Sequence, residues 1–163
     1  MHDENSSPKT YRDAMARYAG HVQIVTTAAG GMMRGVTATA CTSVSDAPPT
    51  VLACVNRHNP RNGLFAEAGN FAINTLGTRH RALADAFSGL GGLSTEQRFA
   101  EATWDLSGSG APVLVGALAS FDCRLIEARE VASHWILIGE VIGVRLGDAD
   151  KPLIYFDRGY CSM

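Results

Sequence analysis

The pattern of hydrophobic and polar residues along the chain is dominated by short stretches typical of β-strands. Three such stretches, rich in Val, Ile and Thr, follow one another at residues 21–28, 35–44 and 50–56. Turns that contain Gly or Pro separate them, which predicts sequential antiparallel strands. Further strands are predicted at residues 71–77, 117–131, 134–146 and 152–160.

Short helices are predicted between these strands. A helix that begins after Ser7 or Thr10 would place Tyr11, Met15 and Tyr18 on one face, at the spacing i, i+4, i+7. The other helices are predicted at residues 61–68, at 79–87 and, after a capping box of Ser94 and Gln97, through Ala102. Six or seven strands with helices inserted rather than alternating predict a mainly β protein, an antiparallel Greek-key-like barrel with short flanking helices. A Rossmann fold is disfavoured because neither Gly-x-Gly run completes the dinucleotide-binding fingerprint.

Composition narrows the class of protein. A chain of 163 residues, 46% of them apolar, predicts one globular domain at residues 10–163 after a flexible arm at residues 1–9. Charged residues make up only 18%, against about 25% in a typical soluble domain, which indicates that a second subunit or a ligand covers part of the surface. The formal net charge of −2 gives no electrostatic case for binding nucleic acid or an anionic membrane.

The sequence carries no pattern typical of a metal site, a secretory leader or a membrane span. Its five histidines are dispersed, and its four cysteines stand apart without a Cys-x-x-Cys pair. The first ten residues are polar and of mixed charge, and the most apolar run, residues 111–119, is far shorter than a bilayer span. We therefore expect a cytoplasmic protein with reduced cysteines and no metal ion.

The segment from Arg34 to Arg61 carries the most informative residues. Thr37, Thr39 and Cys41 alternate with small apolar residues, so one face of the predicted strand carries small hydroxyl or thiol groups. A flat aromatic ligand could lie on this face, with the hydroxyls of the following serines as further hydrogen-bond donors. A barrel strand whose threonines face solvent explains the same pattern equally well.

A second informative stretch, Asn56-Arg57-His58-Asn59, follows the third predicted strand and precedes a helix that begins near Pro60. Free backbone N–H groups, an arginine and amide side chains at such a junction suit an anion such as a phosphate. A surface turn capped by the arginine is the alternative explanation.

Together these two segments resemble the short-chain flavin reductase family, split-barrel proteins that supply reduced flavin to two-component monooxygenases such as those acting on 4-hydroxyphenylacetate or pyrimidines. The resemblance is carried by GVTATACTSVSDAPP at residues 35–49 and VNRHN at residues 55–59. It extends over residues 11–160 in the order of the family, through YRDAMARYAGHVQIVTT (11–27), FAINTL (71–76), AFSG (86–89), RF (98–99), SFDC (120–123), His134 before IGEV (138–141), and PLIY (152–155).

The resemblance implies an FMN-binding split barrel and a role for each of these segments. The cofactor-binding residues that it implies are Val36, Thr37, Ala38, Thr39, Ala40, Ser43, Val44, Ser45, Asn56, Arg57, Asn59, Phe87, Ser88 and Gly89. Among them, the amides and arginine of residues 56–59 would hold the ribityl phosphate, and residues 87–89 would close over the cofactor. His134 would be the catalytic residue beside the nicotinamide, and Arg158 and Tyr160 would contact NADH or NADPH. The chain departs from the family pattern at Ala132-Ser133, where Gly-Asp is common, and at Asn59, where Ser is common.

The activity implied is that of a homodimeric NAD(P)H:flavin oxidoreductase, which reduces FMN or FAD by hydride transfer and supplies a partner monooxygenase. One alternative is a flavin- or haem-binding split barrel without nicotinamide turnover, and another is a barrel that only mediates contacts between subunits. Tyr155 is expected in the core, and Trp104 and Trp135 are expected in the core or in a dimer interface.

Overall fold

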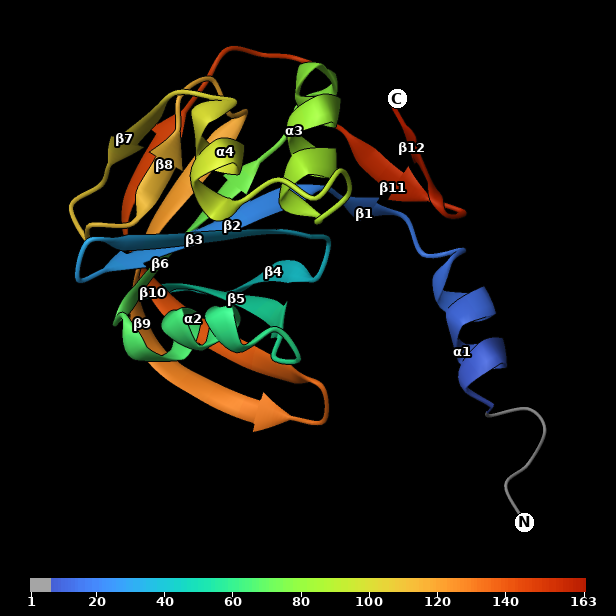
Figure 1. Ribbon diagram of the computed structural model, residues 1–163, viewed down its shortest axis with the longest axis horizontal. Helices are drawn as coiled ribbons and strands as arrows, with labels where there is room; N and C mark the ends of the chain where they lie inside the picture. Colours follow the sequence, from blue (N-terminus) through green and yellow to red (C-terminus); the bar gives the residue numbers. More distant parts are fainter. Residues whose placement is uncertain (1–6) are drawn as a thin grey trace.

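The computed structural model describes residues 7–163, and its architecture is mainly β (Figure 1). The helices are α1 (Pro8–Met15), α2 (Leu64–Glu67), α3 (Arg81–Phe87), α4 (Thr95–Ala100) and the 3-10 helices η2 (Pro60–Gly63) and η3 (Thr78–His80). The strands are β1 (Gly20–His21), β2 (Gln23–Ala29), β3 (Met32–Ala38), β4 (Cys41–Asp46), β5 (Pro49–Asn56), β6 (Asn70–Thr75), β7 (Trp104–Leu106), β8 (Pro112–Leu114), β9 (Ala119–Val131), β10 (His134–Leu146), β11 (Ile154–Phe156) and β12 (Gly159–Cys161).

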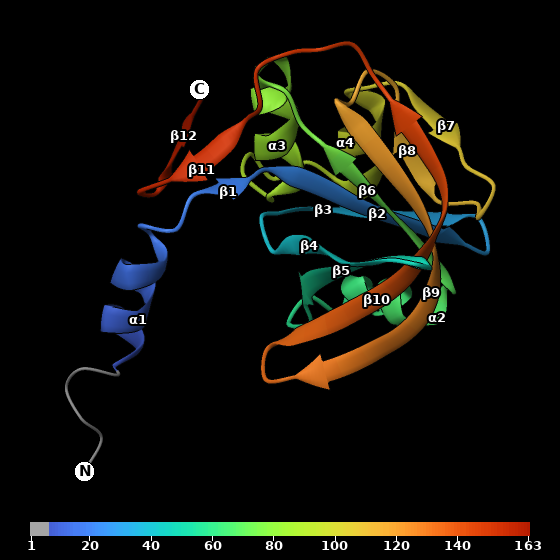
Figure 2. The same ribbon diagram turned by 180° about the vertical axis from the view of Figure 1, so that it is seen from behind.

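A seven-stranded antiparallel sheet forms the barrel, with the strand order β3-β2-β6-β9-β10-β5-β4. Its two edge strands, β3 and β4, follow one another in the chain, and the sheet curls so that they lie next to each other in both views (Figures 1 and 2). Two smaller sheets, β1-β11-β12 and β7-β8, flank the barrel. This architecture confirms the predicted antiparallel split barrel with short flanking helices.

The long hairpin of β9 and β10 connects the two halves of the barrel. Its strands of 13 residues each pair along their length, with register shifts between Ile138 and Gly139 and between Val141 and Gly143. Bulges of this kind bend a strand and increase its twist, so one hairpin can contribute to both halves. Gly139 is required at the first bulge, because a Cβ atom there would lie 2.5 Å from the ring of Phe71.

Two hydrophobic clusters make up most of the core. One fills the interior of the barrel around Phe71, and the other joins α3 and α4 to the sheet. In the second cluster, the rings of Phe87 and Phe99 meet edge to face at a centroid distance of 5.1 Å. Trp104 packs against this cluster and Trp135 against the first, and both are half-buried, which leaves both predicted alternatives, core and dimer interface, open.

Two predicted strands are each divided in the structure. The strand predicted at residues 35–44 is interrupted between β3, which pairs with β2, and β4, which pairs with β5. The strand predicted at residues 152–160 is the β11–β12 hairpin, because Asp157 and Arg158 adopt positive φ angles of 47° and 63° at its turn. Strands β7 and β8 are absent from the prediction, since three residues each are too few to show an alternating pattern.

Helix α1 stands clear of the barrel (Figure 1). Of the two predicted caps, Ser7 is the N-cap, and its Oγ accepts the backbone N–H of Thr10 at 3.1 Å. The arm predicted at residues 1–9 falls mostly outside the described residues, and its last two residues belong to this helix. No residue of α1 is buried, and Tyr11 and Tyr18 are 65% and 73% exposed. Among residues 7–163, no helix is both long and apolar enough to cross a membrane.

Candidate functional site

Several predicted site residues line one groove between β3, α3 and the C-terminal hairpin, hereafter the β3–α3 groove. Its volume is about 520 Å³, which is within the range of small-molecule sites. The lining residues come from segments far apart in the sequence: Val22, Thr37, Ala38, Thr39, Arg81, Asp85, Ser88, Leu90, Tyr155, Arg158, Gly159 and Tyr160. The fold therefore brings together predicted residues from β3, from the end of α3 and from the C-terminus.

Strand β3 forms one wall of this groove. The Oγ1 of Thr37 donates a hydrogen bond to the carbonyl oxygen of Ala84 at 2.6 Å, which fixes α3 against the strand. Thr39 and Ala40, just after the strand, are exposed, whereas Val36 packs against the core inside the barrel. This wall thus combines small side chains with the exposed hydroxyl of Thr39, an arrangement that leaves room for a flat ring.

The opposite wall carries aromatic and charged side chains. The rings of Tyr155 and Tyr160 meet at a centroid distance of 5.5 Å, and the Arg81 guanidinium lies 5.5 Å from the centroid of the Tyr160 ring. Burial, the negative charge of Asp85 and a hydrogen bond with it raise the pKa of Tyr160 to about 12, so this phenol stays protonated at neutral pH. The expectation that Tyr155 lies in the core is wrong: β11 pairs with β1 beside the barrel, and Tyr155 is 40% exposed.

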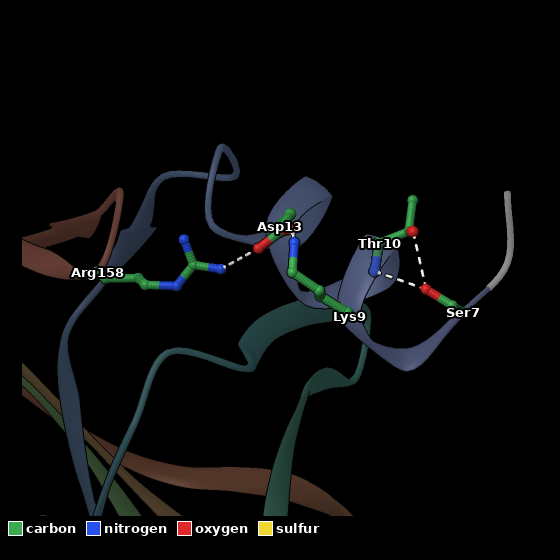
Figure 3. Close-up of polar contacts among 5 residues, drawn as sticks. All are labelled: Ser7, Lys9, Thr10, Asp13 and Arg158. Carbon is green, nitrogen blue, oxygen red and sulfur yellow. Dashed lines mark hydrogen bonds and ion pairs between the residues drawn. The ribbon is translucent and has the colours of Figure 1, made fainter. Parts of the chain in front are cut away.

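Arg158 connects the groove to helix α1 (Figure 3). Its Nη2 donates to Oδ1 of Asp13 at 2.5 Å, and Nζ of Lys9 donates to Oδ2 of the same carboxylate at 2.8 Å. Hydrogen bonds from Lys9 and Arg158 lower the pKa of Asp13. Because exposed ion pairs are weak, Arg158 remains available to an anionic ligand that enters the groove.

The segment predicted to close over the cofactor is divided between the core and the groove. Phe87 is only 2% exposed and packs against Phe99, so its ring cannot cover a ligand, contrary to the prediction. Ser88 lines the groove, and its Oγ donates to the carbonyl oxygen of Asp85 at 2.7 Å. Gly89 follows with a φ of 91°, which favours glycine, and starts the loop to α4.

His134 lies elsewhere, at the start of β10. It pairs with Asn56 of β5, and its Nδ1 is 2.8 Å from Oγ of Ser133. Strands β4 and β5 lie between the β9–β10 turn and the β11–β12 hairpin in both views (Figures 1 and 2). Within one chain, His134 is therefore separated from Arg158 and Tyr160, although all three were predicted to contact the nicotinamide nucleotide.

The residues predicted to hold the ribityl phosphate already have partners within the chain. Arg57 forms an ion pair with Glu130 at 2.9 Å. The Oδ1 of Asn59 accepts the backbone N–H of Arg61 at 3.0 Å and caps η2, and Oδ1 of Asn56 accepts a backbone N–H at 2.8 Å. These contacts are those of a stable surface turn, so an anion would have to displace them to bind there.

The serines of β4 line a second hollow, hereafter the barrel mouth. Ser43 and Ser45 lie at its rim, its volume is about 500 Å³, and β2, β6, β9 and β10 contribute to it. Val44 is 54% exposed and does not line it. Gln23 is 9% exposed in this hollow, and its Oε1 has no hydrogen-bond partner within the described part of the chain. A buried carbonyl oxygen without a partner costs about 1–3 kcal/mol, so this atom would gain from an external donor.

Six groove residues were not predicted to lie at the site: Val22, Arg81, Asp85, Leu90, Tyr155 and Gly159. Arg81 and Asp85 are one turn apart in the helix predicted at residues 79–87, so their i, i+4 spacing already placed them on one face. Which element that face meets depends on tertiary packing, and no local pattern reveals it.

These features define the class of the protein as an antiparallel split barrel with a groove for a small-molecule ligand. The model of the family described as "Flavin reductase like domain" matches residues 15–163, and the chain belongs to this family.

Relatives of known name span nearly the whole chain. FMN reductase (NADH) RutF of Ancylobacter novellus is 44% identical over 154 residues, which cover 94% of this chain and 84% of that protein. The crystal structure of BorF, the flavin reductase component of a bacterial two-component tryptophan halogenase, matches with a TM-score of 0.87 and 26% identity over 96% of this chain and 98% of BorF. NADH:FAD oxidoreductase SgcE6 of Streptomyces globisporus C-1027, in complex with NAD and FAD fragments, matches with a TM-score of 0.85 and 26% identity over 97% and 93% of the two chains.

The residues of the β3–α3 groove fit the chemistry of nucleotide cofactors. Small side chains of β3 leave space for a planar ring, and hydroxyl groups can bond its polar edge. Arg81 and Arg158 supply positive charge for phosphate groups. Within residues 7–163, no group of three or more His, Cys, Asp or Glu side chains is placed to hold a metal ion.

Proposed function

We propose that this protein is an NADH-dependent flavin reductase that reduces FMN and releases it to a partner monooxygenase. The family match and the name of the Ancylobacter novellus relative, FMN reductase (NADH), support the activity and the choice of FMN and NADH. BorF, a reductase component of a two-component system, supports release of reduced flavin to a partner. The observation in the structure that carries the proposal is the β3–α3 groove, where small residues of β3 face Tyr155, Tyr160 and Arg158.

The proposed reaction passes a hydride, two electrons with one proton, from NADH to the flavin and yields NAD⁺ and reduced flavin. The flavin ring supplies the electron-accepting chemistry, and the protein binds and orients the two nucleotides. No side chain has to abstract a proton, which agrees with a groove whose Tyr160 is held protonated beside Asp85. A groove with small residues on one wall and aromatic rings on the other wall only suits a flavin that must dissociate after reduction.

We further infer that the active form is a homodimer. Within a single chain, β4 and β5 lie between His134 at the β9–β10 turn and the β11–β12 hairpin that carries Arg158 and Tyr160 (Figures 1 and 2). A two-fold dimer could place His134 of the partner subunit at the β3–α3 groove. Two other observations favour a covered surface: α1 has no buried residue, and the amide oxygen of Gln23 in the barrel mouth has no partner in the described chain.

A steady-state assay with purified protein tests the proposed activity. With FMN present, the absorbance of NADH should fall at a rate proportional to the protein concentration, faster than with FAD or with NADPH. A protein that turns yellow with FMN but leaves NADH unoxidised would refute the reductase and favour a flavin-binding split barrel. Light scattering that gives the mass of a monomer would refute the shared site.

A further inference from the structure

A third groove, hereafter the arginine groove, is lined by other residues of β3 and of the α3–α4 loop than the β3–α3 groove. Residues of β3, η2, α2 and α4 line a volume of about 550 Å³. Its charged and hydroxyl-bearing residues are Arg34, Arg61, Glu67, Ser94, Thr95 and Glu96. None of them belongs to the predicted site, although Arg61 lies two residues after Asn59, the last residue of the predicted phosphate turn.

Arg34 is a buried arginine with only neutral partners. It is 6% exposed, its Nε donates to Oδ1 of Asn62 at 2.7 Å, and its Nη1 donates to Oγ1 of Thr95 at 3.3 Å. No carboxylate of residues 7–163 lies within 4.0 Å of its guanidinium nitrogens. A buried charge is expensive unless an opposite charge compensates it, and hydrogen bonds to neutral groups compensate only part of the lost hydration. A purely structural role, in which Arg34 only links β3 to η2 and α4, would need hydrogen bonds but no charge. A neutral side chain could form such hydrogen bonds.

Two more guanidinium groups add to this positive charge. Burial, together with the positive charges of Arg98 and Arg61, lowers the pKa of Arg34. Neither Arg61 nor Arg98 forms an ion pair among the described residues. The two carboxylates at the groove, Glu67 and Glu96, are exposed and form no ion pair within residues 7–163. The charge of Arg61 acts on Glu96, but neither carboxylate pairs with Arg34.

We propose that the arginine groove binds a phosphate group of a nucleotide cofactor, held by Arg34 and Arg61 with the hydroxyls of Ser94 and Thr95. A phosphate matches the planar, multi-donor guanidinium better than a single carboxylate does, and its charge would compensate the buried arginine. This proposal rests on the proposed function, because the flavin phosphate and the pyrophosphate of NADH are the available sources. It adds Arg34 and Arg61 to the predicted Arg57, whose guanidinium forms an exposed ion pair with Glu130.

Equilibrium titrations without turnover test this assignment. FMN and riboflavin carry the same ring but differ in the phosphate, so quenching of flavin fluorescence measures the phosphate contribution directly. Arg61 is exposed, and Arg61→Gln should fold and weaken FMN binding by about tenfold or more, with riboflavin binding unchanged within about twofold. Glu96→Gln, also exposed, should tighten FMN binding by about two- to fivefold. Arg129→Gln, which removes an exposed arginine that does not line the groove, is the matched control and should change neither.

The source of the phosphate is distinguished by calorimetric titration of NAD⁺ against the same variants. Weaker NAD⁺ binding with unchanged FMN binding in Arg61→Gln would support the phosphate site with the nicotinamide nucleotide as its ligand. Equal losses for FMN and riboflavin, or losses no larger than those of Arg129→Gln for both nucleotides, would overturn the proposal. A protein that shows the phosphate dependence but does not oxidise NADH would refute the proposed function and leave this site standing.

Discussion

Helix α3 packs closely on β3 because Gly35 has no side chain, and adding one methyl group tests this contact. A Cβ atom at Gly35 would lie 2.5 Å from Cε1 and 2.7 Å from Cδ1 of Phe87, and 3.4 Å from Cζ of Phe99. Carbon atoms in van der Waals contact are about 3.5–4.0 Å apart, so the methyl group would overlap the Phe87 ring by about 1 Å. The ring has no free space to move into, since it is 2% exposed and packs against Phe99 and Trp104.

Overpacking a core in this way costs about 1–3 kcal/mol. In a chain of this size each kcal/mol lowers Tm by about 2–4 °C, so Gly35→Ala should lower Tm by about 2–12 °C in a thermal melt followed by circular dichroism. Gly63→Ala is the matched control, because a Cβ atom there would come no closer than 3.8 Å to Glu67 and 4.0 Å to Trp135. Its helical backbone favours alanine by about 0.5–1 kcal/mol, so this variant should melt at or above the wild-type temperature.

A double-mutant cycle separates the clash from other effects of the substitution. Phe87→Leu removes the ring atoms that the methyl group would meet, so Gly35→Ala should cost less stability in that background. A Gly35→Ala protein with the wild-type Tm would refute the close packing. An equal loss of stability in the wild-type and Phe87→Leu backgrounds would show that another contact is responsible.

Three further predictions concern ionisation and substrate binding. Near neutral pH, iodoacetamide should alkylate the exposed Cys161 and spare Cys41 and Cys123. Burial raises the pKa of the Cys41 and Cys123 thiols to about 12, so neither forms the reactive thiolate at this pH. Equal labelling of the three residues in mass spectrometry would contradict this prediction. The pKa of Tyr160 is about 12 in the folded protein and about 10 in the unfolded chain. The stability that this difference contributes should therefore be present below about pH 10 and be lost as the pH rises to about 12. Denaturant titrations of Tyr160→Phe should lack this loss, and an identical pH profile would exclude Tyr160 as its cause. His134→Gln should raise the KM for NADH more than the KM for FMN, and an unchanged KM for NADH would remove His134 from the nicotinamide site.

The fold could be predicted from the sequence because most strands carry their own signal. Alternating Val, Ile and Thr residues and the turns between them mark the long strands, and the capping box of Ser94 and Gln97 marks α4 as the structure has it. The break between β3 and β4 could not be predicted, since it depends on β4 leaving β2 to pair with β5 across the barrel. The turn at Asp157 and Arg158 holds an arginine at positive φ, where Gly or Asn is usual, so its sequence marks a two-residue hairpin turn only weakly, although Gly159 follows.

The candidate site was predictable only in part, because the position of each side chain in it depends on contacts between elements far apart in the sequence. Thr37, Thr39 and Ser88 could be proposed from local pattern and family resemblance, and the fold brings them to one groove with Arg158. Whether a side chain faces the groove or the core depends on tertiary packing, which places Phe87 in the core and Tyr155 at the groove. Arg34 shows the limit most clearly: a single arginine in a strand predicts an exposed side chain, and its burial without a counter-charge is visible only in three dimensions.

The most direct test of the proposed function is anaerobic reduction of FMN by NADH in the presence of this protein. We predict that the visible absorption of oxidised FMN disappears with one NADH consumed per FMN, at a rate that saturates with NADH concentration. Flavin that stays oxidised in the presence of the protein and excess NADH would contradict the account.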